Sequence, residues 1–336
     1  MQAIVEEEHG PADLLTVQDL PRPLPGPGQL LIQVAAAGVN QADLVQRRGF
    51  YPPPPGASSI YGLEVSGRVN EVGEGADPTL LGQERVALLA GGGYAQYVAV
   101  EADQTLPLPA GMDCVTAGGL VEVAATLYSN FQALGISFDP ALNAGKSLLV
   151  QGGSGGIGSQ AISWGRLLGL EVFATCSSQD KCDYVASLGA RPINYRQQNF
   201  RQVIREETAG RGVDFILDTV GGPYLEDNIK SLALEGSLVV IGLQGGPKGT
   251  LNLGYMLPRR LTVQATSLRN RPLAHKAQIL AGLQRDIWPF YASGQLDVRV
   301  DSSFPLAQAA HAHQRMEAGE HRGKILLLPE QEGAAC

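Results

Sequence analysis

The amino-acid sequence predicts an α/β protein of two domains, a small partly closed β-barrel and a doubly wound parallel sheet. At 336 residues the chain is longer than one hydrophobic core usually serves. Residues 1–122 are dense in short strand candidates and turns, whereas residues 123–267 alternate between strand and helix candidates. Closely spaced short strands are typical of a small barrel. Regular β-α-β-α order is typical of a parallel sheet covered by helices on both faces.

In the first region, segments that block regular structure separate the strand candidates. Residues 21–28 and 51–56 are rich in proline, which disfavours both helices and central strands. The strand candidates are residues 2–5, 14–19, 29–36, 63–69, 85–89 and 94–100. We expect the first two to pair as a hairpin.

In the second region, apolar runs alternate with helical patterns. The expected strands are residues 147–150, 171–176, 191–194, 213–219, 237–243 and 261–265, and the expected helices are residues 157–168, 181–188, 200–207 and 224–232. The tail, residues 268–336, holds helical stretches at 274–293 and 306–317 and strand candidates at 297–300 and 324–328. From the sequence, this tail could extend either domain.

A glycine-rich turn follows the first strand of the alternating region. It reads Gly153-Ser154-Gly155-Gly156-Ile157-Gly158 and opens a helix, as in dinucleotide-binding fingerprints. Such glycines permit a tight turn, a close approach of backbone to a pyrophosphate, and close packing of helix on strand. The helix N-terminus then offers N–H groups and a positive dipole end. An ordinary strand-to-helix turn is the alternative, but the β-α alternation that follows favours a dinucleotide site.

Composition excludes several classes of function. A net charge of −8 argues against a general nucleic-acid binder, and no apolar run is long enough to cross a membrane. The N-terminus lacks the pattern of a signal peptide, so we expect a cytoplasmic protein. The histidines form no site, because His311 and His313 point to different sides of a helix. The cysteines, Cys114, Cys176, Cys182 and Cys336, are scattered without a CxxC pair, which predicts reduced, individually placed thiols.

The end of the second expected strand bears on the choice of nucleotide. NAD-preferring fingerprints place an acid there for the ribose 2′-hydroxyl, but this chain has Cys176 and Ser177. Ser177 and Lys181 could receive a 2′-phosphate, so NADPH is favoured. Asp180 argues against this, unless it serves the helix dipole. Lys181 could equally be a solvated helix residue.

Several segments together resemble a known family. They are residues 38–49, with an Asn-x-x-Asp pattern, and residues 52–56, 62–67, 91–97, 193–196 and 323–327. In these segments the chain resembles the zinc-free medium-chain dehydrogenases/reductases of the NADPH:quinone oxidoreductase (zeta-crystallin-like) family. It is most similar to the tumour-suppressor-inducible quinone oxidoreductase subgroup.

This resemblance implies a domain plan. Residues 1–122 and 268–336 would form a GroES-like catalytic domain, and residues 123–267 a Rossmann NADPH-binding domain. Zinc-dependent relatives carry Gly-His-Glu where this chain has Gly62-Leu63-Glu64, and leucine cannot ligate zinc. We therefore expect no metal site and a structural role for Glu64. Family members commonly form homodimers through their last Rossmann strands, here residues 237–243 and 261–265.

The resemblance also implies site residues. Asn40, Asp43 and Tyr51 are the catalytic candidates: Asn40 for a hydrogen bond to substrate or ribose, Tyr51 as a donor to the developing oxyanion, and Asp43 to orient them. Turn and helix-capping roles are the alternative for Asn40 and Asp43. Arg322 and Lys324 are secondary candidates for positive charge near the phosphates. The cofactor-binding candidates are Thr126, Gly153, Ser154, Gly155, Gly156, Ile157, Gly158, Ser177, Lys181, Tyr195, Ile241, Gly242, Leu243, Ser267 and Leu268. Tyr195 could otherwise be an aromatic residue at a strand edge.

The function that follows is NADPH-dependent reduction of a small-molecule quinone by direct hydride transfer, without a metal. A quinone needs less acid assistance than a ketone, because the aromatic ring stabilises its reduced oxyanion. One alternative is a 2-enoyl (alkene) reductase on the same scaffold. Another is a non-catalytic nucleotide-binding protein, as when zeta-crystallin accumulates in the lens. We expect no nucleic-acid partner.

Overall fold

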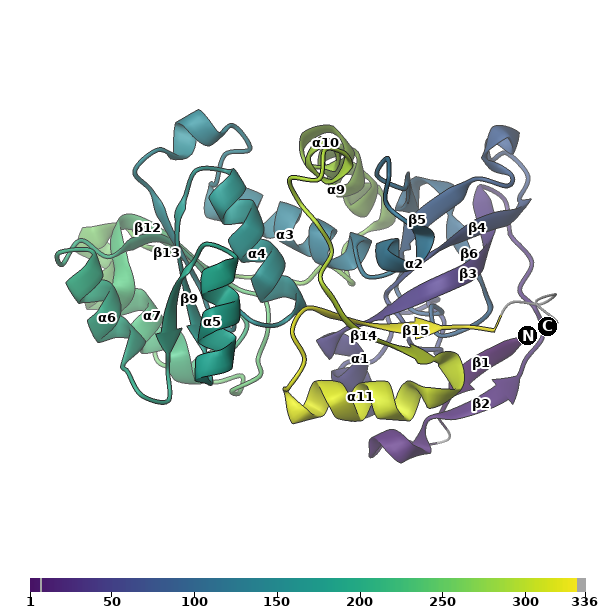
Figure 1. The fold of residues 1–336 in the computed structure, drawn as a ribbon, viewed down its shortest axis with the longest axis horizontal. Coiled ribbons are helices and arrows are strands. Elements are labelled where there is room, and N and C mark those ends of the chain that lie inside the picture. The colour runs from purple at the N-terminus through teal and green to yellow at the C-terminus, as the bar shows by residue number, and fades with distance from the viewer. Residues whose placement is uncertain (7, 331–336) are drawn as a thin grey trace. The chain divides into compact units, whose positions relative to one another are not determined.

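The computed structural model describes residues 1–6 and 8–330, and the chain divides into two compact units. One unit comprises Met1–Ala125 and the chain from Leu268 onward, and the other comprises Thr126–Ser267. Both are shown in Figure 1. We call them the GroES-like unit and the Rossmann unit, because their topologies confirm the fold class expected from the sequence.

The GroES-like unit is built on a mixed sheet that forks at one long strand. The strand order is β14-β15-β3-β4-β5-β7, and β6 also pairs with β3. The strands are β3 (Gln29–Val39), β4 (Glu64–Val72), β5 (Glu84–Leu88), β6 (Tyr97–Glu101), β7 (Thr105–Pro107), β14 (Val300–Pro305) and β15 (Lys324–Leu328). The first half of β3 pairs with β6 and its last residues pair with β15, so one strand joins the two arms. The tail therefore extends this unit, which answers the question left open by the sequence.

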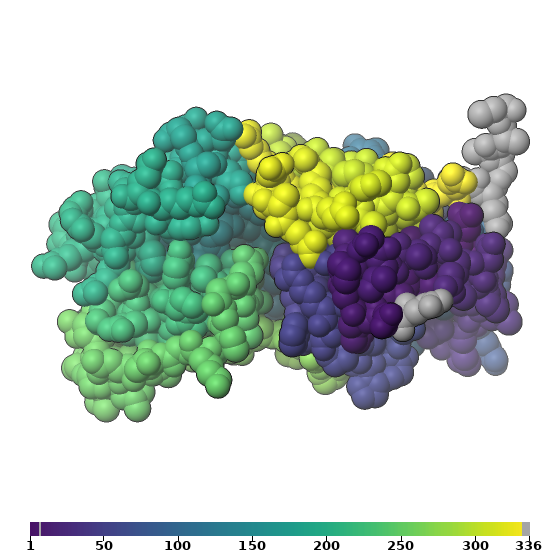
Figure 2. All heavy atoms as spheres, turned by 90° about the horizontal axis from the view of Figure 1, so that it is seen from below, coloured from purple at the N-terminus to yellow at the C-terminus, as the bar shows by residue number. Residues whose placement is uncertain are grey.

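A hairpin and a C-terminal helix close one side of this unit. The strands β1 (Gln2–Val5) and β2 (Thr16–Asp19) pair antiparallel, as expected. Helix α11 (Ala309–Ala318) contacts the 3₁₀ turn η1 (Ala12–Leu14). Figure 2 shows the yellow C-terminal segment lying against the purple N-terminal one. Their buried apolar side chains belong to one core with those of β3 and β15.

The Rossmann unit is a six-stranded parallel sheet of order β10-β9-β8-β11-β12-β13. Its strands are β8 (Ser147–Val150), β9 (Glu171–Cys176), β10 (Arg191–Asn194), β11 (Val213–Asp218), β12 (Leu232–Val240) and β13 (Thr262–Ala265). Its connecting helices are α4 (Gly156–Leu167), α5 (Gln179–Ser187), α6 (Phe200–Glu207) and α7 (Leu225–Ser231). The order reverses after β10, so right-handed crossovers place α4 and α5 on one face and α6 and α7 on the other (Figure 1). Ligands of such sheets bind at the reversal point, outside the carboxyl ends of β8 and β11.

Several element boundaries differ from the expectations. The expected strand 237–243 is displaced, because β12 ends at Val240, and the expected strand 297–300 begins only at Val300. The expected helix 274–293 is broken into α9 (Leu273–Asp286) and α10 (Trp288–Ala292), with Pro289 in the first turn of α10. Helices α1 (Gln41–Arg47), α2 (Cys114–Ala117) and α8 (Leu253–Met256) were not anticipated as elements, and α3 (Val121–Leu134) contains Thr126, which the family resemblance places on a helix before the glycine turn. Among the helices of the described residues, none has the length and hydropathy needed to cross a membrane.

Candidate active site and nucleotide site

The glycine turn between β8 and α4 is held by the neighbouring strand β9. Gly152 N donates to Thr175 Oγ1 at 3.0 Å, and Gly153 N donates to Thr175 O at 2.8 Å. The Thr175 hydroxyl in turn donates to Gln151 Oε1 at 2.8 Å. One buried threonine therefore fixes the start of the turn, where the chain leaves β8.

Two glycines of this turn are required by close packing, and a third faces open space. A Cβ added at Gly158 would lie 2.1 Å from Gly152 O, and one at Gly153 would lie 2.7 Å from the Cβ of Ala174. A Cβ added at Gly155 would meet nothing within 4 Å. Because the first N–H groups of α4 have no acceptor within the helix, this open N-terminus suits a phosphate group. The turn thus fits a dinucleotide, because the backbone N–H groups at the start of α4 face open space beside Gly155.

Three candidate residues gather at the carboxyl ends of β9 and β10. Ser177 follows β9, and Lys181 lies in the first turn of α5, where its N–H points to the N-cap Ser178 Oγ at 3.4 Å. Tyr195 follows β10, and its N–H donates to Cys176 O at 3.1 Å. The Tyr195 side chain is 42% exposed. Asp180 lies in the first turn of α5, the position that favours the helix dipole.

Two cysteines in this region are not individually placed, so that expectation is wrong. The thiols of Cys176, at the end of β9, and Cys182, on α5, lie 2.8 Å apart. They come together because α5 folds back along β9 directly after a short loop. Cys114 stands apart on α2, and Cys336 lies outside the described residues.

The remaining nucleotide candidates lie in the loop after β12 and near the two points where the chain passes between units. Ile241, Gly242 and Leu243 follow β12 instead of ending it. Thr126 and Ser267 belong to the Rossmann unit. The side chain of Asn130 joins Thr126 to Thr266, the residue before Ser267. Asn130 Nδ2 donates to Thr126 O at 2.7 Å, and its Oδ1 accepts from Thr266 Oγ1. Leu268 begins the second segment of the GroES-like unit and is 8% exposed.

Asp43, on α1, is a fully buried carboxylate. It accepts hydrogen bonds from Asn40 N at 2.8 Å, Gly62 N at 3.1 Å and the Tyr94 hydroxyl at 3.1 Å. Burial raises the pKa of Asp43 to about 6, although these hydrogen bonds oppose the rise. Because no part of Asp43 is exposed, it acts by orienting the start of α1 and the Gly62 segment.

Asn40 is bound into a buried ion pair. Lys324 Nζ lies 2.6 Å from Asn40 Oδ1 and 2.6 Å from Glu64 Oε1, and Asn40 Nδ2 donates to Glu64 Oε1 at 3.1 Å. Lys324 is 3% exposed and Glu64 is fully buried. The expectation that Lys324 lends charge to cofactor phosphates is therefore wrong, because its ammonium group is already paired in the core. The other Glu64 oxygen, Oε2, accepts from Glu122 N at 3.0 Å.

Arg269 holds three segments around Tyr51, and sequence reasoning missed it. Its guanidinium donates to Ala90 O at 2.9 Å, to Tyr51 O at 3.2 Å and to Gln46 Oε1 at 2.8 Å. The Tyr51 ring centroid lies 5.2 Å from its Cζ, a cation–π distance. Burial lowers the pKa of Arg269. One cation thus ties α1, the Tyr51 loop and the loop after β5 to the segment after Leu268.

A second buried network lies behind Asp43. The Tyr94 hydroxyl lies 3.2 Å from His313 Nε2, and His313 Nδ1 lies 3.3 Å from Arg47 Nη1. Arg47 also pairs with Glu317. Burial lowers the pKa of His313 to about 3, so this histidine is neutral and serves packing, whereas His311 is exposed. In the described residues, no group of three His, Cys, Asp or Glu side chains is arranged to hold a metal ion.

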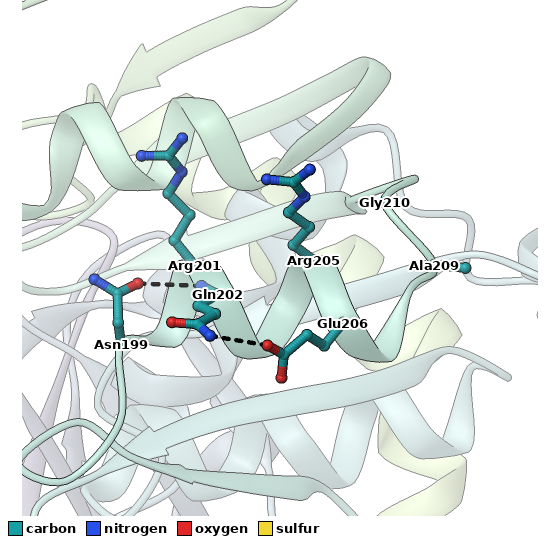
Figure 3. A pocket seen from close by; sticks show the side chains of 7 residues that line it. All are labelled: Asn199, Arg201, Gln202, Arg205, Glu206, Ala209 and Gly210. Atoms are coloured by element: carbon teal, nitrogen blue, oxygen red, sulfur yellow. Dashed lines mark hydrogen bonds between the residues drawn. The ribbon is translucent and has the colours of Figure 1, made fainter.

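A hollow of about 710 Å³ on the Rossmann unit has none of these candidates in its lining (Figure 3). It is lined by Asn199, Arg201, Gln202, Arg205, Glu206, Ala209 and Gly210, at and beyond the ends of α6. Gln202 Nε2 donates to Glu206 Oε1 at 2.9 Å, and Arg201 pairs with Asp227 at 3.5 Å. All the long side chains that line it are exposed, so it is an open surface and not a built site.

Comparison with known proteins assigns the chain to a superfamily. The family model described as an alcohol dehydrogenase GroES-like domain matches residues 26–110, and one described as a zinc-binding dehydrogenase matches residues 188–327. Prostaglandin reductase-3 of Mus musculus is 30% identical over 324 residues, which cover 92% of this chain and 84% of that protein. The chain belongs to the medium-chain dehydrogenase/reductase superfamily.

Other relatives of this superfamily member differ in length and in the activity for which they are named. The phthioceranic/hydroxyphthioceranic acid synthase of Mycobacterium tuberculosis is 30% identical over 327 residues, but the chain spans only 15% of that protein's length. The structure of Escherichia coli quinone oxidoreductase complexed with NADPH has a TM-score of 0.87 and 26% identity, covering 98% of this chain and 100% of that one. A 2-haloacrylate reductase structure has a TM-score of 0.82 and 27% identity over the same shares.

Proposed function

We propose that this chain is an NADPH-dependent quinone reductase that works without a metal. The observation that carries the proposal is that the Leu63–Glu64 segment offers no side chain that is available to bind zinc. Leucine replaces the histidine of the zinc-dependent relatives, and the neighbouring Glu64 carboxylate is committed to Lys324. A scaffold without a Lewis acid at this place suits an acceptor whose reduced oxygen needs little stabilisation. A quinone is such an acceptor.

The candidate residues divide into three groups in this proposal. The glycine turn, residues 153–158, would hold the pyrophosphate, and Ser177, Lys181 and Tyr195 would receive the 2′-phosphate. Thr126, residues 241–243, Ser267 and Leu268 would surround the nicotinamide end, and the bound cofactor would supply the hydride. The Tyr51 hydroxyl would donate to the oxygen that gains charge. Asn40 and Asp43 would hold the Tyr51 side of the site in shape.

Reduction of an activated carbon–carbon double bond is the second candidate. It is supported by the similarity to a 2-haloacrylate reductase and to prostaglandin reductase-3. The same placement of NADPH and Tyr51 would serve it, with Tyr51 as proton donor to carbon. Quinone and alkene thus differ in the acceptor and not in the scaffold.

Steady-state oxidation of NADPH separates the two candidates. We expect efficient turnover of a naphthoquinone or an ortho-quinone and little turnover of a 2-enoyl thioester. Efficient turnover of the thioester alone would contradict the quinone proposal. NADPH binding with turnover of no acceptor would indicate a binding protein. Tyr51→Phe tests the donor role separately. It removes the hydroxyl but keeps the ring beside the Arg269 guanidinium. An unchanged kcat in this variant would show that the Tyr51 hydroxyl is not the proton donor.

The preference for NADPH is tested at Lys181. We expect the chain to bind NADPH more tightly than NADH. Lys181→Ala should narrow the ratio of the two affinities by roughly 10- to 100-fold, since one charged contact contributes roughly 1.5–3 kcal/mol. Fluorescence titration of both nucleotides measures this. The matched control is Gln179→Ala, two residues earlier on the same helix turn, which should leave the ratio unchanged. Equal affinities in the unaltered chain would show that the end of β9 does not select the phosphate.

We also propose a homodimer through the edge of the Rossmann sheet. Strand β13 is the last in the sheet order, so it presents unpaired backbone groups on one side. Exposed leucines lie close to it in sequence: Leu251, Leu253 and Leu257 are 44%, 65% and 79% exposed. A second copy pairing along β13 would cover both features. A monomer at micromolar concentration in light scattering would contradict this proposal.

A further inference from the structure

The thiol pair Cys176–Cys182 has no role in the proposed reaction. Cys176 is the last residue of β9, and Cys182 lies in the second turn of α5. Their Sγ atoms are 2.8 Å apart. The S–S distance in a disulfide bond is only about 0.8 Å shorter than this. Cys182 N donates to Ser178 O at 3.0 Å, so the backbone of α5 is regular at the residue that carries the second thiol. A small side-chain movement is enough to bring the sulfurs to bonding distance.

The pair encloses the segment to which the 2′-phosphate is assigned. Between the two cysteines lie Ser177 and Lys181, and the carbonyl of Cys176 accepts the N–H of Tyr195. Cys176 Sγ also lies 3.7 Å from Ile193 O on β10. A covalent bond between the sulfurs would therefore constrain the backbone that carries Ser177 and Lys181 and that accepts the N–H of Tyr195.

We propose that Cys176 and Cys182 form a reversible disulfide that weakens the binding of NADPH. The effect on NADPH rests on the proposed function, whereas the disulfide itself does not. The oxidant is a small-molecule disulfide. One cysteine thiolate attacks it to form a mixed disulfide and release one thiol, and the second cysteine displaces the other thiol. The two cysteines lose two electrons and two protons, and the small disulfide is reduced to two thiols.

The surroundings determine how fast this exchange runs. Cys176 and Cys182 are 2% and 5% exposed, and burial raises the pKa of Cys176, against the opposing charge of Lys181. The exchange is therefore slow and follows opening of the segment between β9 and α5. A nucleotide bound to this segment stabilises its closed form. NADPH therefore slows formation of the disulfide, and by reciprocity it disfavours the disulfide at equilibrium by the same free energy with which the disulfide weakens NADPH binding.

The test uses the full chain in the reduced state, incubated for hours with oxidised glutathione. After alkylation of free thiols, peptide mass spectrometry identifies which cysteines are linked. We expect a Cys176–Cys182 linkage, restored to free thiols by dithiothreitol and delayed by NADPH. Cys182→Ser should abolish the linkage, and Cys114→Ser, which removes a thiol of the GroES-like unit, should leave it unchanged. A chain that carries only glutathione adducts, or keeps both thiols free, would overturn the proposal.

The binding effect is measured separately by titrating NADPH into the reduced and oxidised chains. We expect the Kd to rise by about tenfold on oxidation, within the usual range of coupling between two sites. An unchanged Kd in a chain with the verified linkage would overturn the coupling. A reduced chain that binds no NADPH would contradict the proposed function instead, and the mass-spectrometric result would stand.

Discussion

Lys324→Met is expected to lower the free energy of unfolding by about 3–5 kcal/mol, because it leaves a carboxylate buried without its partner. Glu64 is fully buried, and its Oε1 lies 2.6 Å from the ammonium group of Lys324. Methionine keeps most of the volume of the lysine stem and removes only the charge. Equilibrium unfolding in urea measures the loss.

The surrounding backbone is shaped to hold this pair. A Cβ at Gly38 would lie 2.2 Å from Glu64 Oε1, and one at Gly119 would lie 3.2 Å from the Cε of Lys324. Larger residues at either place would push the two side chains from their positions. The pair is therefore a fixed part of the core, unlike a surface ion pair that can rearrange.

A charge-neutral double variant isolates the electrostatic part of this effect. Lys324→Met combined with Glu64→Gln removes both charges, so it should cost less than the sum of the two single changes. The control is Lys230→Met, which breaks the pair of Lys230 with Glu226, whose side chain is 60% exposed. An exposed pair of this kind contributes about 1 kcal/mol or less. If Lys324→Met cost no more than Lys230→Met, the buried pair would have no special role in stability.

Loss of Lys324 should also reach the candidate active site. Asn40 Oδ1 would lose its 2.6 Å donor, and the amide would be held only through Nδ2, which donates to Glu64 Oε1 and Gly38 O. Lys324→Arg keeps a positive charge, but the planar guanidinium spreads this charge over a larger group than the ammonium of lysine. We therefore expect Lys324→Arg to be more stable than Lys324→Met but less stable than the unaltered chain.

The Rossmann unit was predictable because its signals are local. Strands β8, β9 and β10 coincide with the expected ranges, and β8 and β9 are short, largely apolar runs bounded by glycine or by a change to helical spacing. Strand β12 was misplaced because its first residues, Leu232–Leu234, also fit the preceding helical pattern. Local signals fix the existence of an element better than its ends.

The candidate site in the GroES-like unit was less predictable because its contacts are long-range. Lys324 pairs with a residue 260 positions away, and Arg269 binds Gln46 across 223 positions. No spacing rule connects such residues, so Lys324 was assigned to the wrong role and Arg269 to none. Helix α1 was missed for another reason: Asn40 and Asp43 are common in turns as well as at helix starts. The thiol contact was missed because it depends on how α5 folds back along β9, which the six-residue spacing does not reveal.

Gly158→Ser is expected to destabilise the chain by about 1–3 kcal/mol and to abolish measurable binding of NADPH. A Cβ at this position would lie 2.1 Å from Gly152 O and 2.8 Å from Gly153 Cα. Both atoms belong to the backbone, so no side-chain rotation relieves the clash, and α4 must move away from the turn.

The same substitution at Gly155 separates folding from binding. Gly155 is the N-cap of α4, with ordinary extended backbone angles and open space where a side chain would project. Serine is a good N-cap residue, so Gly155→Ser should leave the thermal unfolding midpoint unchanged or slightly raised. Its hydroxymethyl group would nevertheless occupy the space before the helix, and the affinity for NADPH should fall. Full affinity in Gly155→Ser would show that no phosphate binds at this N-terminus, because a ligand seated there cannot share the space with a side chain. Loss of affinity with an intact fold would instead locate the nucleotide at the one point of the turn that packing leaves open.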